Sequence, residues 1–188
     1  MVDLKSGINP LFLRQDDLRQ GIELLFYAYR DFTGEPDEIL ASYGFGRAHH
    51  RAIYFVGRNP DVTVSELLAI LKITKQSLSR VLSGLVEQGF IEQNSDPADG
   101  RRRRLTLTEK GHRLESELSA TQIRRIARAY RKAGAEAVQG FREVMLGIVN
   151  AEDRARAMKP HQPAGKSRDG AAQRNNQDPD AGPRVPDN

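Results

Sequence analysis

The sequence predicts a mainly α-helical fold that carries one small β-hairpin. Over most of the chain, apolar residues recur at intervals of three and four, which is the period of an amphipathic helix. Three of these apolar runs begin directly after threonines suited to a helix N-cap: Thr63, Thr74 and Thr108. Two turn dipeptides, Asp96-Pro97 and Asp99-Gly100, separate two short strand-like segments and indicate a hairpin.

The N-terminal part of the chain predicts three helices. The first covers residues 11–32 and carries an apolar stripe of Leu18, Ile22, Leu25, Phe26 and Tyr29. We expect Thr33-Gly34 and Pro36 to end it, because proline cannot donate the next helical hydrogen bond. A short helix is expected over 36–42. After Gly44 and Gly46, a further helix over 47–57 places apolar residues on one face.

The middle of the chain predicts two helices separated by a very short turn. Thr63 and Glu66 form a capping box that begins the first of them. Lys72-Ile73 makes the turn, and Thr74 begins the second helix, which runs to about Gln88. Gly89 then suits the left-handed position that ends many helices.

The hairpin follows, with strands expected at 90–93 and 103–107. Thr108 begins a long helix that Gly134 interrupts, and a last helix follows with its own apolar stripe.

Composition excludes several classes of chemistry. The 188 residues contain no cysteine, so disulfides, thiolate metal sites and thiol redox sensing are excluded. No apolar run approaches the roughly 18 residues that span a membrane, and the start of the chain lacks the pattern of a signal peptide. We therefore expect a cytoplasmic protein without a membrane segment. The net charge is +4, and between Asp96 and Arg131 ten basic residues stand against five acidic ones. This local excess is typical of a nucleic-acid footprint.

The order helix, short turn, helix and hairpin is that of a winged helix-turn-helix, whose second helix presents its N-terminal residues to base edges in the major groove. Those positions hold hydrogen-bonding side chains without an acid among them: Thr74, Lys75, Gln76, Ser77, Ser79 and Arg80. Glutamine pairs with adenine, and lysine or arginine with guanine. The wing hairpin carries Arg101, Arg102, Arg103 and Arg104, and the negative potential of a narrow minor groove attracts arginine. Alternation along an extended chain would point Arg101 and Arg103 one way and Arg102 and Arg104 the other.

Residues 61–111 resemble the MarR family of bacterial transcriptional regulators. The matching segments are VTVSELLAILKITKQSLSRVLSGLVEQGFIE and DPADGRRRRLTLTEKG, and the second is similar to the family's wing pattern, Asp-x-Arg followed by Leu-x-Leu-Thr-x-x-Gly. The flanking helices extend the resemblance to about residues 11–155. It implies a homodimer in which Asp99 orients Arg101 and Arg101 reads the minor groove. Many members carry arginine where this chain has Gly100, so which arginine enters the groove stays open.

The resemblance also implies repression that responds to a small-molecule effector, although the family includes activators. Effectors of similar proteins bind between the dimer helices and the DNA-binding lobe. The candidate contacts in this chain are Tyr27, Tyr43, Arg47, His49 and His50. We expect no metal or cofactor, because adjacent histidines on a helix point about 100° apart and cannot chelate one ion well.

The sequence thus predicts four regions: an N-terminal dimerisation helix (1–34), a winged helix-turn-helix lobe (35–107), C-terminal dimerisation helices (108–157) and a disordered tail (158–188), whose composition offers almost nothing to bury. The physical case for a dimer is that the outer helices have broad apolar stripes that the small central unit cannot cover. The predicted function is sequence-specific binding of double-stranded DNA at a pseudo-palindromic operator, without catalysis. Two alternatives remain: a nonspecific architectural DNA-binding protein and a winged-helix module for protein contacts.

Overall fold

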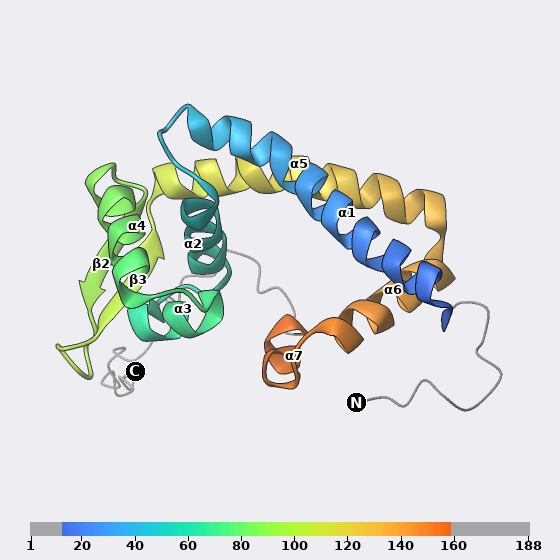
Figure 1. The fold of residues 1–188 in the computed structure, drawn as a ribbon. Coiled ribbons are helices and arrows are strands. Elements are labelled where there is room, and N and C mark those ends of the chain that lie inside the picture. Colours follow the sequence, from blue (N-terminus) through green and yellow to red (C-terminus); the bar gives the residue numbers. More distant parts are fainter. Residues whose placement is uncertain (1–12, 159–188) are drawn as a thin grey trace, which may run out of the picture.

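The computed structural model describes residues 13–158, and the predicted tail lies outside them apart from Met158. Seven helices and three short strands make up this part of the chain (Figure 1). The helices are α1 (Gln15–Ala41), α2 (Arg47–Arg58), α3 (Val64–Leu71), α4 (Lys75–Glu87), α5 (Glu109–Ala133), α6 (Ala135–Ile148) and α7 (Ala151–Ala157). The strands are β1 (Val62–Thr63), β2 (Ile91–Ser95) and β3 (Arg103–Leu107). The mainly helical fold with a small hairpin is therefore confirmed.

The lobe that contains α2, α3, α4 and the strands forms around one hydrophobic core. Its largest fully buried side chains include Phe90, Ile53, Leu67 and Leu85, which come from three helices and from the start of the hairpin. Strand β3 lies between β1 and β2 and pairs antiparallel with both. The sequence did not predict β1, because a two-residue strand leaves no alternation to detect.

The three predicted threonine caps are confirmed, and each hydroxyl accepts a backbone N–H of the first helical turn. Thr63 accepts from Glu66 at 3.2 Å, while the Glu66 carboxylate accepts the N–H of Thr63 at 2.8 Å and so completes the capping box. Thr108 accepts from Gly111 at 3.0 Å and donates to the Gly89 carbonyl at 2.7 Å. That second bond joins the beginning of α5 to the end of α4.

The predicted end of the first helix at residues 33–36 is wrong. Helix α1 continues through Pro36 to Ala41, and no separate helix begins at residue 36. Proline leaves the carbonyl of Phe32 without its helical donor. The side chain of Gln122, from α5, donates to that carbonyl at 3.4 Å. Thr33 meanwhile donates its hydroxyl to the Tyr29 carbonyl at 3.0 Å. The helix survives because a distant element replaces the missing bond.

Helices α1, α5 and α6 extend away from the central lobe as an elongated helical region (Figure 1). Gly134, with a φ of 85°, separates α5 from α6 as expected. The break between α6 and α7 at Val149-Asn150 was not expected. Across residues 13–158, no helix is long and apolar enough to cross a membrane.

Candidate nucleic-acid interface

Helix α4 separates an apolar buried face from a polar exposed face. Its buried residues are Leu78, Val81, Leu82 and Leu85. The predicted reading residues Thr74, Lys75, Gln76, Ser77, Ser79 and Arg80 are all exposed. Thr74 caps the helix by accepting the Ser77 N–H at 3.1 Å. The helix therefore presents six polar side chains and the positive end of its dipole to solvent, while its other face packs into the core.

The turn before α4 contains a left-handed residue, Lys72, with a φ of 49°. The Lys72 ammonium lies 2.6 Å from a carboxylate oxygen of Glu152 and 2.7 Å from one of Asp153, both in α7. These acids raise the pKa of Lys72. The contact connects the helix-turn-helix to the C-terminal helices, and sequence reasoning missed it because α7 was not predicted as a separate element.

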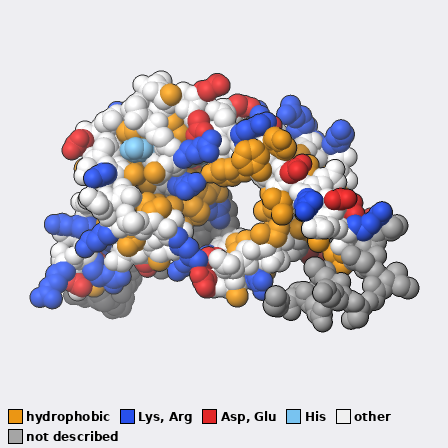
Figure 2. All heavy atoms as spheres, viewed as in Figure 1, with side chains coloured by type: hydrophobic (Ala, Val, Ile, Leu, Met, Phe, Trp, Pro, Cys, Tyr) orange, Lys and Arg blue, Asp and Glu red, His pale blue; other side chains and the backbone are white. Residues whose placement is uncertain are grey.

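The tip of the wing hairpin carries Arg101 and Arg102. Both lie in the turn, since β3 begins only at Arg103, and the expected strand alternation across all four arginines is therefore wrong. Both are exposed, and neither guanidinium makes a hydrogen bond or ion pair with any residue in the described range. Figure 2 shows the Lys and Arg side chains of this region projecting together at the lower left, where Figure 1 places the hairpin tip.

The base of the wing holds the other two arginines. Arg103 donates to the hydroxyl of Ser95, directly across the hairpin, at 2.6 Å. The Arg104 guanidinium lies 3.0 Å from the carboxylate of Asp96. The four adjacent arginines thus divide into two whose guanidinium groups make no hydrogen bond or ion pair among residues 13–158 and two whose guanidinium groups are bonded within the hairpin.

Two aspartates shape the turn between the strands. Asp99 accepts the backbone N–H of Arg101 at 3.1 Å through its side chain, and its carbonyl accepts the N–H of Arg102 at 2.9 Å. The resemblance implies that Asp99 orients Arg101, and the bond between them in the structure is to the Arg101 backbone N–H. Asp96 accepts the N–H of Ala98 at 2.9 Å, and its own N–H donates to the Arg102 carbonyl at 3.0 Å.

Asp96, which sequence reasoning placed only in a turn, is buried and bonded at the base of the wing. Its side chain is 2% exposed. The hydrogen bond from the Ala98 N–H, followed by the bond from Arg104, lowers the pKa of Asp96 below its ordinary value. A nearby acid, Glu66, also has a lowered pKa, chiefly through its bonds with Thr63 and additionally through the charges of Arg102 and Arg104. Arg102 and Arg104 therefore both lie within the field of these two carboxylates.

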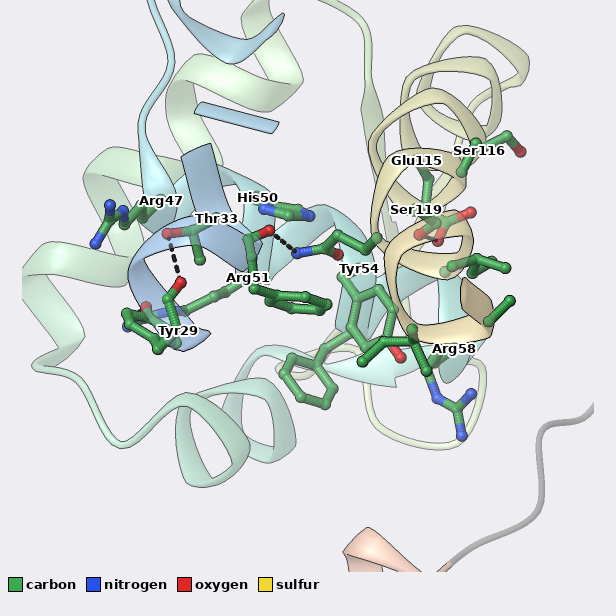
Figure 3. A pocket seen from close by; sticks show the side chains of 18 of the residues that line it. Tyr29, Thr33, Arg47, His50, Arg51, Tyr54, Arg58, Glu115, Ser116 and Ser119 are labelled. Carbon is green, nitrogen blue, oxygen red and sulfur yellow. Dashed lines mark hydrogen bonds between the residues drawn. The ribbon is translucent and has the colours of Figure 1, made fainter. Parts of the chain in front are cut away.

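A cavity of about 950 Å³ lies between α1, α2 and α5 (Figure 3). Tyr29 and Thr33 line it from α1, and Arg47, His50, Arg51 and Tyr54 line it from α2. Glu115, Ser116 and Ser119 face them from α5, as Figure 3 shows. Arg51 donates to the hydroxyl of Tyr29 at 2.8 Å, which joins α2 to α1 across one wall. The contribution of α5 was not predicted, because that helix was assigned to dimerisation alone.

The cavity brings together two of the five predicted effector contacts, Arg47 and His50. Arg47 pairs with Asp37 at 2.8 Å, which raises the pKa of its guanidinium. The other three lie elsewhere. Tyr43 and His49 pack against the ring of Phe45, and Tyr27 is exposed on α1. Burial lowers the pKa of both His49 and His50. In the described part of the chain, no three His, Asp or Glu side chains lie close enough together to hold a metal ion.

Comparison with known proteins adds a sequence relationship. Residues 43–102, which run from before α2 to the wing, match the sequence model of the MarR family. The HTH-type transcriptional regulator PetP of Rhodobacter capsulatus is 53% identical over 145 residues, which are 77% of this chain and 87% of that protein.

Solved structures share the fold at low sequence identity. The crystal structure of a MarR family transcription regulator has a TM-score of 0.63 at 19% identity, and covers 77% of this chain and 95% of its own. The structure of Streptococcus pneumoniae FabT in complex with DNA has a TM-score of 0.64 at 18% identity, and covers 76% of this chain and 100% of its own. The resemblance includes the helical region as well as the winged lobe.

Proposed function

Because the chain belongs to the MarR family of transcriptional regulators, we propose that it acts as a homodimer that binds double-stranded DNA at a pseudo-palindromic operator and represses transcription until an effector binds. The family is one of regulators rather than enzymes. A structural relative, FabT, has been solved in complex with DNA. The proposed division of the chain is that of the sequence analysis, with α1, α5, α6 and α7 forming the dimerisation region.

The observation that carries the DNA-binding proposal is the exposed polar end of α4 beside a wing whose two tip arginines have no protein partner within residues 13–158. Lys75, Gln76, Ser77 and Arg80 would read base edges, since amide and guanidinium groups pair with adenine and guanine in the major groove. Thr74 and Ser79 would contact phosphates near the N-terminus of the helix. Arg101 and Arg102 are exposed in the turn at the tip, and they would enter the minor groove.

The support for a homodimer is apolar surface that one chain leaves uncovered. Large side chains on α1, α5 and α6 remain largely exposed, among them Ile22 at 69%, Phe26 at 63%, Ile123 at 65% and Val144 at 64%. Orange apolar side chains along the helical region in Figure 2 belong to this surface. Exposed apolar patches of this kind mark interfaces. A two-fold axis would set two recognition helices about 34 Å apart, one turn of B-DNA.

The support for effector control is the position of the cavity. It is walled by α1 and α5, which carry the proposed dimer surface, and by α2, which packs against α4. A small molecule bound there would contact both regions and bias the angle between them, which sets the spacing of the two recognition helices. The lining is mainly apolar with tyrosine hydroxyls and arginines at its wall, so Arg47 and His50 remain the effector contacts we propose.

Selection of duplexes from a random-sequence library by the wild-type protein tests the proposal. We expect a two-fold symmetric consensus. Gln76→Ala should relax the preference at one base position per half-site, and Arg101→Ala should weaken binding by about 1–3 kcal/mol. Gel-shift titration on the selected duplex measures both effects, and unchanged affinity of Arg101→Ala would remove that residue from the wing contact.

The same experiment separates the alternatives. Equal affinity for selected and random duplexes would indicate a nonspecific architectural protein. Retention of no duplex at low salt would indicate that the winged lobe serves protein contacts.

A further inference from the structure

The wing contains an acidic residue, although a negative charge on a DNA-binding surface would repel the phosphates. Asp96 lies at the end of β2, beside the proposed DNA-reading tip, and its negative charge would oppose phosphate. Its side chain is nonetheless 2% exposed and bonded on both oxygens, one to the Arg104 guanidinium at 3.0 Å and the other to the Ala98 N–H at 2.9 Å. A surface acid left over by chance would be solvated and without such bonds.

The bonds of Asp96 join the two sides of the turn. The carboxylate holds Ala98 on the outgoing side and Arg104 on the returning strand, and the Asp96 N–H donates to the carbonyl of Arg102 at 3.0 Å. The tip residues Arg101 and Arg102 lie between these fixed points. Their direction relative to α4 therefore depends on Asp96, although Asp96 itself faces inward.

The Arg104 guanidinium is bonded within the wing, with the side chain 37% exposed. Its Nε atom is buried and has no partner within residues 13–158, its guanidinium is paired with Asp96, and the acid Glu66 lies nearby. Its backbone is also central in the sheet, opposite Thr63 on one side and Asn94 on the other. A guanidinium in that place cannot swing out to phosphate without leaving Asp96 buried and unpaired, which is costly.

We propose that Asp96 is a positioning residue for DNA reading: its ion pair with Arg104 commits that arginine to the inside of the wing and aims Arg101 and Arg102 at the minor groove. The inference rests on the proposed DNA-binding function. It divides a run of four identical residues into two that hold the wing and two that read.

Neutralisation of Asp96 gives the sharpest test, because simple electrostatics and the positioning role predict opposite signs. Asp96→Asn keeps the shape and an acceptor for the Ala98 N–H but removes the charge beside Arg104. Removal of a negative charge near DNA should otherwise strengthen binding. We expect Asp96→Asn to weaken binding to the duplex that the wild type selects by about fivefold or more, the lower end of what one groove contact contributes. Affinity for a scrambled duplex of equal length should change little. Fluorescence anisotropy measures both affinities.

Two arginine variants provide a matched comparison that does not depend on Asp96→Asn folding. Arg102→Gln and Arg104→Gln each remove one positive charge from the same run. Arg102→Gln should reduce the slope of log affinity against log salt by about 0.9 for each phosphate that Arg102 neutralises. Arg104→Gln breaks the same ion pair as Asp96→Asn, so it should weaken binding to the selected duplex by a similar factor, and the double variant should lose little more. Thermal unfolding of each full-length dimer controls for stability.

The outcomes separate the two proposals. Asp96→Asn or Arg104→Gln binding the selected duplex as tightly as wild type or more tightly would overturn the positioning role while the DNA-binding function stands. A wild type that prefers no duplex would overturn both.

Discussion

At the scale of single residues, His50 makes the stability of the fold depend on pH. It is 9% exposed, and burial lowers its pKa; the charges of Asp37 and Glu115 oppose that shift, and the charge of Arg51 adds to it. In the unfolded chain, the imidazole of His50 takes up a proton near its ordinary pKa of about 6.5, whereas in the folded chain it takes up that proton only at lower pH. Stability is therefore present above about pH 6.5 and is lost as pH falls through the folded pKa of His50. His49, whose pKa burial also lowers, acts in the same direction.

We expect the unfolding midpoint in urea to fall as pH decreases from 7.5 to 5.0. His50→Gln should flatten that dependence, because the substituted side chain takes up no proton. A His50→Gln protein as sensitive to acid as the wild type would contradict this account.

Gly111 shows how a single missing side chain allows two elements to meet. A Cβ atom at this position would overlap the carbonyl oxygen of Phe90, which is a backbone atom and cannot rotate away. The same carbonyl accepts the backbone N–H of Thr108 at 3.1 Å. The first turn of α5 therefore packs directly against the backbone that follows α4.

Gly111→Ala should destabilise the protein by about 1–3 kcal/mol, the range for overpacked sites. Gly140→Ala is the matched control, because an added methyl there meets nothing within 4 Å in the same chain. It should stabilise helix α6 by about 0.5–1 kcal/mol. Denaturant titration of both variants measures the difference, and equal stabilities would show that the Phe90 contact relaxes freely.

At the scale of elements, the N-cap at Thr108 leads to a prediction about stability. Its hydroxyl both caps α5 and donates to the Gly89 carbonyl, so alanine removes two bonds at one junction. Thr108→Ala should cost about 1–2 kcal/mol of unfolding free energy, the upper part of the range for removal of a cap. Thr108→Ser keeps the hydroxyl and should restore most of that stability. Failure of serine to rescue would place the effect in the methyl group instead.

The caps were predictable from sequence because a cap is decided within four residues. Thr63, Thr74 and Thr108 each begin a helix where the sequence placed it. The course of α1 was not predictable locally. Pro36 ends a helix by every local rule, and the donor that replaces its missing bond belongs to Gln122, 90 residues from the Phe32 carbonyl that it serves.

The candidate site likewise has a part that the sequence predicts and a part that it does not. The exposed polar end of α4 follows from helical periodicity, so the residues that we propose read DNA could be named from the sequence. Which arginine pairs with Asp96 depends on where the turn ends and β3 begins. Four identical arginines in a row give no sequence signal that distinguishes Arg104 from the other three. The residues of α5 that line the cavity depend on how this long helix packs against α1 and α2. The spacing of apolar residues alone does not specify that packing.

At the scale of the whole molecule, the exposed apolar surface predicts what happens when dimerisation is blocked. Phe26→Glu places a charge on α1 at a side chain that is 63% exposed in one chain and that we propose is covered in the dimer. Because burial of an unpaired carboxylate costs several kcal/mol, the variant should run as a monomer in light scattering at micromolar concentration. It should also lose binding to the selected duplex.

Gln88→Glu is the control, since it adds the same charge at an exposed position of the winged lobe. It should remain a dimer. Dimeric Phe26→Glu would show that α1 lies outside the interface.

The uninterrupted length of α5 has a mechanical consequence. With 25 residues, it acts as a lever arm about 37 Å long that carries the wing at one end and meets α6 at the other. A tilt of about five degrees about one end sweeps the other through an arc of about 3 Å, close to the 3.4 Å rise of one base-pair step. If an effector binds in the cavity as we propose, a rotation of this size would be enough to move the recognition helices of the proposed dimer out of register with the operator.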